Sequence, residues 1–286
     1  MASPSQSDRI AIATAFVAQA PPGELADVVT DVRVLFDNEE LLAPELPTAL
    51  ATFHADRLTA VPVPWGQHKA IICAPAAIDE AAYRYLDPRA AKSFTFDPVT
   101  LAVSAEEDAE PSSAEAMRKD LESHLDTYSA AHYPNGNAGV YAVDPTEFHV
   151  VIASEKLNAS NFWNAQWRSH WTWKEGKLHG DMSATVHYYE DGNVQLHNTH
   201  QEAIDVPADS TAEAVIKAIK KAESARHKAL HSAYADMSEK VFRGLRRALP
   251  LTRTKLDWNK IANYKVGAEL SGKAAASSSS PTSSSP

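Results

Sequence analysis

Three histidines, His187, His197 and His200, come closest in residue type and spacing to a metal site. Imidazole nitrogens bind Zn²⁺, but a spacing of three residues on a strand places His197 and His200 on opposite faces. The single cysteine, Cys73, adds at most one thiolate and is typical of a small buried side chain. We therefore expect no metal and no cofactor, and keep a metal-dependent enzyme as a contrasting hypothesis that metal analysis can test.

The other patterns of catalytic side chains are equally weak. The adjacent acids of "YYEDGN", Glu190 and Asp191, are typical of a solvated tight turn rather than of a working carboxylate pair. The sequence has ten glycines and contains no phosphate-binding glycine loop, no zinc-protease helix motif and no serine elbow. These observations predict a protein that is not an enzyme.

A cluster of basic residues near the C-terminus is the strongest candidate for function. The whole chain has a formal net charge of −10, yet residues 240–265 hold eight bases against one acid, Asp257. The bases are Lys240, Arg243, Arg246, Arg247, Arg253, Lys255, Lys260 and Lys265. A merely solvated helix face usually mixes both signs, so this segment predicts binding to an acidic partner. The acidic chain shows no nucleic-acid-binding module, which does not favour nucleic acid as that partner.

The stretch NFWNAQWRSHWTW, residues 161–173, holds four of the six tryptophans. They are Trp163, Trp167, Trp171 and Trp173. All four fall on odd positions, whereas the even positions from Asn164 on are polar, and this period of two predicts a strand. Each indole can bury roughly 150–250 Å². We therefore expect an aromatic face that packs against a large element, such as a covering helix, and has little direct role in binding.

Amphipathic helices are predicted near the N-terminus. Apolar residues recur at helical spacing in residues 7–20, with Ser7 or Asp8 as cap, and again in residues 21–38. A third, weaker pattern covers residues 43–58 and contains a proline near its first turn, which a helix tolerates. The first two patterns indicate paired helices.

The next part of the chain has a different texture. Two short, proline-bounded apolar runs, residues 61–75 and 93–103, predict short strands in an irregular region. The acidic stretch from Glu106 to Glu110 is typical of a solvated loop. A helix is predicted from Ala114 to His132.

The second half predicts a sheet and a long helix. Two hairpin patterns, one of them turning at Asp191-Gly192, flank the tryptophan strand and indicate an antiparallel meander of about five strands. A proline-free helical pattern then runs from Ser210 to Leu249, which corresponds to roughly 55 Å at about 1.5 Å per residue. Such a helix would overhang a five-stranded sheet, so we expect a second chain to extend the sheet.

Composition places these elements in a soluble protein. Apolar residues make up 44% and charged residues 22% of the chain, as in folded cytosolic proteins. We expect neither a secretion signal nor membrane insertion, because the first residues are polar and the apolar runs are short. The serine-rich last fifteen residues are expected to be disordered.

Five segments resemble the alpha subunit of F-actin capping protein. They are NFWNAQWRSHW, VHYYEDGNVQL, LDPRAAKSFTFD, APPGELADVVTDVR and LRRALPLTRTKLDWNKIANYK. The resemblance runs in order from about Arg9 to Leu270. The sequence departs from the family at Ala165-Gln166, where Gly-Arg is usual, in a shortened connection at KEGKLHGDM, and in the serine-rich tail.

The resemblance implies an α+β fold whose central antiparallel sheet is shared with a partner subunit and covered by a long C-terminal helix. The implied segments are an N-terminal helical stalk (1–60), an irregular globule with short strands and a helix (61–137), the antiparallel sheet (138–205), the long helix (206–249), a mobile amphipathic C-terminal tentacle (250–271) and a disordered serine-rich tail (272–286).

The resemblance also implies a function. It implies an obligate heterodimer with the F-actin capping protein beta subunit, which caps the barbed end of actin filaments without calcium and without severing. Acidic phosphoinositides and capping-protein regulators are implied as further partners, and cortical actin in the cytoplasm as the location. The implied actin contacts are Arg243, Arg247, Arg253, Lys255, Leu256, Trp258, Ile261 and Tyr264. The alternative is a scaffold that binds acidic phospholipids through the same basic helix.

Overall fold

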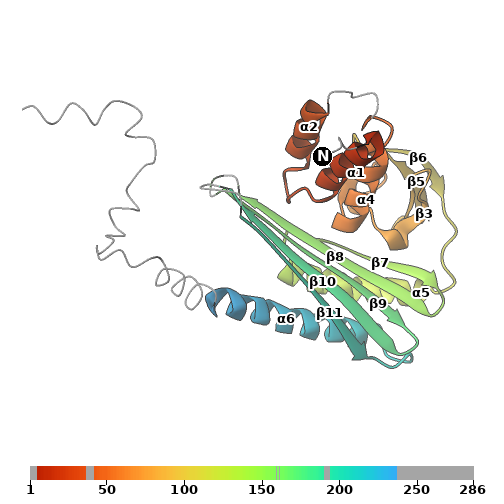
Figure 1. The fold of residues 1–286 in the computed structure, drawn as a ribbon. Coiled ribbons are helices and arrows are strands. Elements are labelled where there is room, and N and C mark those ends of the chain that lie inside the picture. The colour runs from red at the N-terminus through yellow and green to blue at the C-terminus, as the bar shows by residue number, and fades with distance from the viewer. Residues whose placement is uncertain (1–4, 37–41, 159, 161, 190–193, 237–286) are drawn as a thin grey trace, which may run out of the picture. The chain divides into compact units, whose positions relative to one another are not determined.

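The computed structural model describes residues 5–36, 42–158, 160, 162–189 and 194–236 (Figure 1). The chain divides into two compact units, residues 1–227 and 228–286. Helix α6 (Ala212–Asp236) begins in the first unit and ends in the second. The described strands and the other described helices all belong to the first unit.

The described N-terminal helices are α1 (Gln6–Ala18), α2 (Leu25–Leu35) and α4 (Leu46–Arg57). They pack on a small apolar core, which is Ala13, Val17, Val32, Leu42, Leu46 and Leu50. The predictions of helices in residues 7–20, 21–38 and 43–58 are therefore confirmed in kind, with shorter bounds.

The cap of α1 differs from the prediction of Ser7 or Asp8. Ser5 is the N-cap, since its hydroxyl accepts from the backbone N–H of Asp8 at 3.2 Å. The Asp8 carboxylate in turn accepts from the Ser5 backbone N–H at 3.1 Å. This reciprocal capping box requires an acid or amide side chain three residues after the cap. Ser5 has Asp8 at that position, whereas neither Ser7 nor Asp8 is followed by such a residue.

Short strands form two small sheets after α4. Their bounds are β1 (Ala60–Pro62), β2 (Lys69–Ile71), β3 (Ala77–Asp79), β4 (Arg84–Asp87), β5 (Lys92–Phe96) and β6 (Val103–Asp108), with a 3₁₀ turn η1 (Ala74–Ala76) between β2 and β3. Strands β1 and β2 pair with each other, and the other four form an antiparallel sheet in the order β3-β4-β5-β6. Buried Tyr85, Phe94 and Phe96 form the centre of this region, and Cys73 is fully buried beside them as predicted.

The prediction of a solvated loop from Glu106 to Glu110 is wrong for its first three residues. Residues up to Asp108 belong to strand β6, which pairs with β5. The acidic side chains point to solvent and meet bases there, as in the 2.6 Å ion pair from Arg84 to Glu107. Charge alone predicted a loop, but an edge strand can expose its side chains while its backbone pairs with a neighbour.

The main sheet is a five-stranded antiparallel meander in the order β11-β10-β9-β8-β7. Its strands are β7 (Asn137–Asp144), β8 (Glu147–Asn158), β9 (Trp163–Lys174), β10 (Lys177–Tyr188) and β11 (Val194–Asp205). The predicted strand pairs and the tryptophan strand are present, whereas the turn predicted at Asp191-Gly192 lies outside the described residues. The β9–β10 hairpin turns through Glu175 and Gly176, which both have positive φ (50° and 77°), as a two-residue hairpin turn requires.

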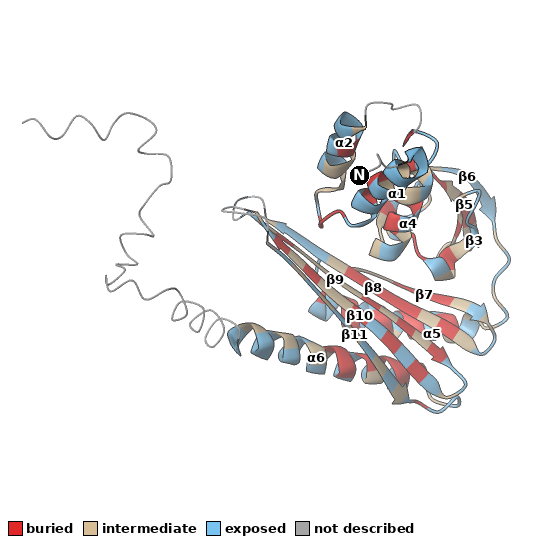
Figure 2. Ribbon diagram, viewed as in Figure 1, coloured by how far each residue is buried: buried red, intermediate tan, exposed pale blue. Residues whose placement is uncertain are grey.

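Helices α5 (Glu115–His132) and α6 cover one face of this sheet (Figure 1). The core between them includes Leu121 and Leu125 of α5, Val215 and Ile219 of α6, and the large residues of the sheet. The buried positions of α6 all lie between Ala212 and Glu223, and Figure 2 shows them on the side that faces the strands. Among the described residues, no helix is long and apolar enough to span a membrane.

Candidate functional site

The eight residues predicted to contact actin all follow Asp236 and lie outside the described residues. They are Arg243, Arg247, Arg253, Lys255, Leu256, Trp258, Ile261 and Tyr264. The described sites are therefore those of the sheet: its helix-covered face, its opposite face and its edge.

Trp167, Trp171 and Trp173 of β9 belong to or pack against the core under the helices, as the period of two predicts, whereas Trp163 contacts Lys156 of β8. Trp171 is fully buried and Trp173 is 5% exposed, whereas Trp163 and Trp167 are only half-buried. Trp173 stacks on Phe148 of β8 with ring centroids 5.7 Å apart. Of the four indoles, the two nearest the C-terminal end of the strand, Trp171 and Trp173, are therefore part of the buried core.

Glycine on the neighbouring strand makes room for the largest of these side chains. Gly180 of β10 is the cross-strand partner of Trp171. A Cβ atom at Gly180 would lie 2.2 Å from a carbon of the Trp171 ring, far inside van der Waals contact. The indole therefore lies flat over the glycine, which explains a glycine in the interior of a strand.

A buried carboxylate connects α6 to the sheet and to α5. Glu223 of α6 is 0% exposed and accepts four hydrogen bonds. One oxygen accepts from Ser169 Oγ at 2.5 Å and Trp171 Nε1 at 3.0 Å, and the other from Tyr128 Oη at 2.6 Å and Tyr133 Oη at 2.7 Å. Burial and the adjacent carboxylate raise the pKa of both tyrosines, so their hydroxyls remain donors. Glu223 was not predicted from the sequence, although a lone acid on the apolar face of a helix is a signal for such a residue.

The three histidines considered as a metal pattern have separate partners. His187 contacts Glu24 of the segment before α2. His197 is 3.0 Å from the Thr185 hydroxyl, and His200 is on the opposite face of β11, 3.8 Å from Glu202. Within the described part of the chain, no three acids, histidines or cysteines form a group that could hold a metal ion.

The two edges of the main sheet differ. Strand β7 packs against α5 and β2, and its Tyr141 donates to the Ile71 carbonyl at 3.3 Å. Strand β11 pairs only with β10 among the described strands, and none of residues 195–205 is buried. An open twelve-residue edge presents unpaired backbone N–H and C=O groups along its whole length.

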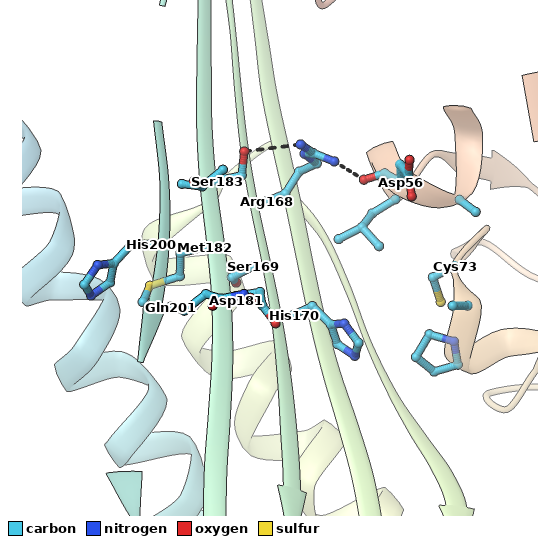
Figure 3. A pocket seen from close by; sticks show the side chains of 15 residues that line it. Asp56, Cys73, Arg168, Ser169, His170, Asp181, Met182, Ser183, His200 and Gln201 are labelled. Atoms are coloured by element: carbon cyan, nitrogen blue, oxygen red, sulfur yellow. Dashed lines mark hydrogen bonds between the residues drawn. The ribbon is translucent and has the colours of Figure 1, made fainter. Parts of the chain in front are cut away.

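The sheet face opposite the helices carries a polar cleft of about 680 Å³ between α4, η1 and strands β9–β11 (Figure 3). Arg168, Ser183 and Gln201 lie along its sheet side, and Asp56 and Leu58 along its helix side. Figure 3 shows Arg168 reaching from β9 toward Asp56 of α4. Arg168 and His170, two of the even positions of β9 that the sequence marked as polar, therefore face this cleft.

Two arginines join the N-terminal helices to this face. Arg168 donates to the Asp56 carbonyl near the C-terminus of α4 and to Ser183 Oγ at 3.2 Å. Arg57 donates to the Ala20 carbonyl at 3.2 Å and to Gln166 at 3.5 Å. Burial and the neighbouring Arg57 lower the pKa of Arg168 to about 10, so both guanidinium groups are charged at neutral pH.

A pair of histidines lies on the same face. His149 Nδ1 is 2.9 Å from His170 Nε2, and His149 Nε2 is 3.0 Å from Glu147. Burial, with a smaller contribution from His149, lowers the pKa of His170 to about 4, although Asp181 acts in the opposite direction. Both rings are therefore neutral near pH 7, because the pKa of His149 is also lowered by burial.

These features define an α+β protein built on one antiparallel sheet, with one face closed by helices, a polar cleft on the other, and an open edge. An open strand edge of this kind is suited to pairing with a further strand.

Comparison with known proteins identifies the family. A sequence profile of the F-actin capping protein alpha subunit matches residues 13–269. The F-actin-capping protein subunit alpha of Neurospora crassa is 34% identical over 268 residues, covering 91% of this chain and 96% of the relative. That of Caenorhabditis elegans is 34% identical over 282 residues, covering 93% and 98%. The chain belongs to the F-actin capping protein alpha subunit family.

A solved structure has the same fold. The homodimeric actin capping protein alpha subunit from Plasmodium berghei superposes with a TM-score of 0.68 at 18% sequence identity, covering 86% of this chain and 99% of that chain.

Proposed function

We propose that this chain is the alpha subunit of a heterodimeric F-actin capping protein that binds barbed filament ends and blocks subunit exchange there, without calcium, severing or catalysis. The observation that carries the proposal is the family match over residues 13–269, which spans the sheet, the covering helix and the basic C-terminal segment. The relatives in Neurospora crassa and Caenorhabditis elegans are both named F-actin-capping protein subunit alpha. The match to this chain covers nearly the whole length of each.

The open edge at β11 supports pairing with a beta subunit. The strand is long, and its described side chains are mostly polar on the cleft face and half-buried on the helix face. A second antiparallel strand added here would satisfy its free backbone groups and continue the sheet.

The N-terminal helices, proposed as a stalk, support the same partner. Ile12 and Phe16 of α1 lie one turn apart and are 54% and 59% exposed, and Val34 and Leu35 of α2 are both 77% exposed. Large apolar side chains grouped outward on adjacent helices are typical of a surface that a second subunit covers.

Actin binding is proposed for the C-terminal segment that follows. Arg243, Arg247 and Arg253 would pair with acidic groups of actin, and the apolar side of a tentacle would fill a groove. The tentacle contacts are Lys255, Leu256, Trp258, Ile261 and Tyr264. Acidic phosphoinositides would compete for the same bases, and the expected location is the cortical actin of the cytoplasm.

The proposal is tested with the purified heterodimer in a seeded actin elongation assay. We expect the complex to stop barbed-end growth at a concentration of about 10⁻⁹ M, as for tight protein complexes. Charge reversal at Arg243, Arg247 and Arg253 should weaken capping while the heterodimer still assembles. The matched control reverses three bases of α6, Lys217, Lys220 and Lys221.

Two results would contradict the proposal. Unchanged capping by the Arg243/Arg247/Arg253 variant would refute the assigned residues. Binding to phosphoinositide vesicles without any effect on elongation would instead favour the phospholipid scaffold.

A further inference from the structure

Helix α6 is buried only along its first half. Its buried positions lie between Ala212 and Glu223, and residues 224–236 are exposed or half-buried. Glu223 is therefore the last buried residue of the helix. The first half packs on the sheet, and the second half leads into the residues that follow Asp236.

The apolar contacts of α6 fix its position better than its direction. Val215, Ile216 and Ile219 pack in the core beneath the helix. Apolar attraction depends on the area removed from water and has no preferred direction. A hydrogen bond restricts a small rotation more sharply, because it weakens steeply once its angle falls below about 120°.

The hydrogen bonds of Glu223 fix the helix from two sides. Ser169 and Trp171 donate to one carboxylate oxygen from strand β9. Tyr128 of α5 and Tyr133, which follows the end of α5, donate to the other oxygen. Because the two oxygens are held by donors from different elements, a rotation, a tilt or a shift of α6 lengthens bonds on at least one side.

The contacts of α6 just beyond Glu223 restrain it less. Arg226 donates to the side chain of Asn198 on β11, and the His227 ring lies 4.2 Å from the Trp167 ring between centroids. These four side chains are half-buried or exposed, so water competes for their polar groups. Glu223 is therefore the strongest directional restraint at the point where the helix leaves the core.

A small change of direction at Glu223 becomes a large displacement along the helix. Asp236 follows Glu223 by thirteen positions, which corresponds to about 20 Å at about 1.5 Å per residue. A tilt of about 10° would displace a point at that distance by about 3 Å. Arg243, the first residue proposed to contact actin, follows seven positions after Asp236.

We propose that Glu223 is a positioning residue for actin capping, because it fixes the direction of the helix that carries the C-terminal basic segment. The inference rests on the proposed function, since it assumes that residues from Arg243 onward contact actin. Glu223 is fully buried, so it acts through the helix and not by contact with actin. A segment held in its binding orientation loses less freedom when it binds, and this preorganisation slows dissociation.

Capping kinetics of the purified heterodimer test this role. The wild-type complex is assayed first, and the Glu223→Ala and Glu223→Gln complexes are then compared at a temperature at which all three remain folded. We expect Glu223→Ala to raise the rate of dissociation from barbed ends about tenfold. Glu223→Gln keeps part of the hydrogen bonds and should restore most of that loss.

The matched control loses stability in another part of the chain. Phe94 is fully buried in the core around the short strands, and this core contains no described residue of α6. Phe94→Ala should lower the Tm about as much as Glu223→Ala and leave the rate of dissociation as in the wild type. An equal rise of that rate in both variants would assign the effect to stability alone and overturn the proposal.

The direction of the helix is measured by double electron-electron resonance between two spin labels. They are attached at Ser232→Cys, nine positions after Glu223 and on the opposite side of α6, and at Glu155→Cys of β8, both exposed. The native Cys73 is buried and does not react. We expect a narrow distance distribution in the wild type, a broad one in Glu223→Ala and a narrow one again in Glu223→Gln.

Two further results would overturn the proposal: an unchanged rate of dissociation for Glu223→Ala, or an unchanged distance distribution in that variant. Ser169→Ala removes one donor and leaves α6 intact, so it decides the case if Glu223→Ala does not assemble. It is expected to raise the rate about threefold, and an unchanged rate would again overturn the proposal. Absence of capping by the wild-type heterodimer would instead overturn the proposed function, so the two failures are distinguishable.

Discussion

Replacement of Glu223 by alanine is the sharpest test of how α6 is fixed to the sheet. In the native chain its two oxygens accept from Ser169, Trp171, Tyr128 and Tyr133 at 2.5–3.0 Å. The four donors share this one carboxylate, which is fully buried. Alanine would therefore leave four donors without their shared partner.

The expected loss follows from the number of donors. A buried group left without a hydrogen bond costs about 1–3 kcal/mol, and the three hydroxyls can rotate to reduce their share. At about 1 kcal/mol for each donor, Glu223→Ala should cost about 4 kcal/mol. At roughly 2–4 °C per kcal/mol for a chain of this size, the Tm should fall by about 8–16 °C.

Glutamine at the same position gives the internal comparison. Its oxygen can accept from Ser169 and Trp171, and its amide nitrogen can donate to the hydroxyl oxygens of Tyr128 and Tyr133, which also accept. Glu223→Gln should therefore cost about half as much as Glu223→Ala, roughly 2 kcal/mol.

Thermal unfolding of the purified complex, followed by near-ultraviolet circular dichroism, measures both variants. Glu213→Ala removes an exposed acid from the first turn of α6 and serves as control, with an expected cost below about 1 kcal/mol. A Tm for Glu223→Ala within 2 °C or so of the control, or equal losses for alanine and glutamine, would refute the account of Glu223 as a shared acceptor.

Three further predictions concern the same sheet and its helices. Gly180→Ala should cost about 1–3 kcal/mol in urea unfolding because its Cβ would meet the Trp171 ring; an unchanged midpoint would contradict this. The folded-state pKa of His170 is lowered to about 4 from the ordinary 6.5, so its contribution to stability is complete above pH 6.5 and is lost toward pH 4; His170→Gln should flatten this part of the stability profile. Hydrogen bonds from Arg118 lower the pKa of Glu115 below its usual 4.5, so this contribution is complete above pH 4.5 and is lost in more acidic solution; Glu115→Gln should remove that loss, and an identical acid limb would refute it.

Local patterns predicted the main sheet well. Tryptophans at the odd positions of residues 163–173 predicted a strand, because successive side chains of a strand point to opposite faces. Turn residues between apolar runs predicted the hairpins. The same reasoning failed at β6, where acidic side chains indicated a loop, and at the start of α1, where the cap is Ser5 rather than Ser7 or Asp8. At β6 the pairing with β5, which local composition does not report, decided the outcome, and at α1 the capping box of Ser5 and Asp8 did.

Contacts between distant residues could not be predicted in this way. Glu223 meets Ser169 across 54 residues and Tyr128 across 95, and Arg168 meets Asp56 across 112. In the sequence Glu223 is an ordinary acid of a helix and Arg168 an ordinary base of a strand. Only the fold reveals that Glu223 is fully buried and that Arg168 reaches the end of α4.

The side chains of strand β9 alternate between two faces of the sheet that have different surroundings. Its odd side chains, among them Trp171, pack under α6 and respond to changes in volume and to loss of the Glu223 hydrogen bonds. Its even side chains, among them Arg168, face the cleft and respond to changes in charge. Neighbouring substitutions along one strand should therefore differ in effect, because core packing depends on shape whereas the hydrogen bonds of a guanidinium depend on its charge.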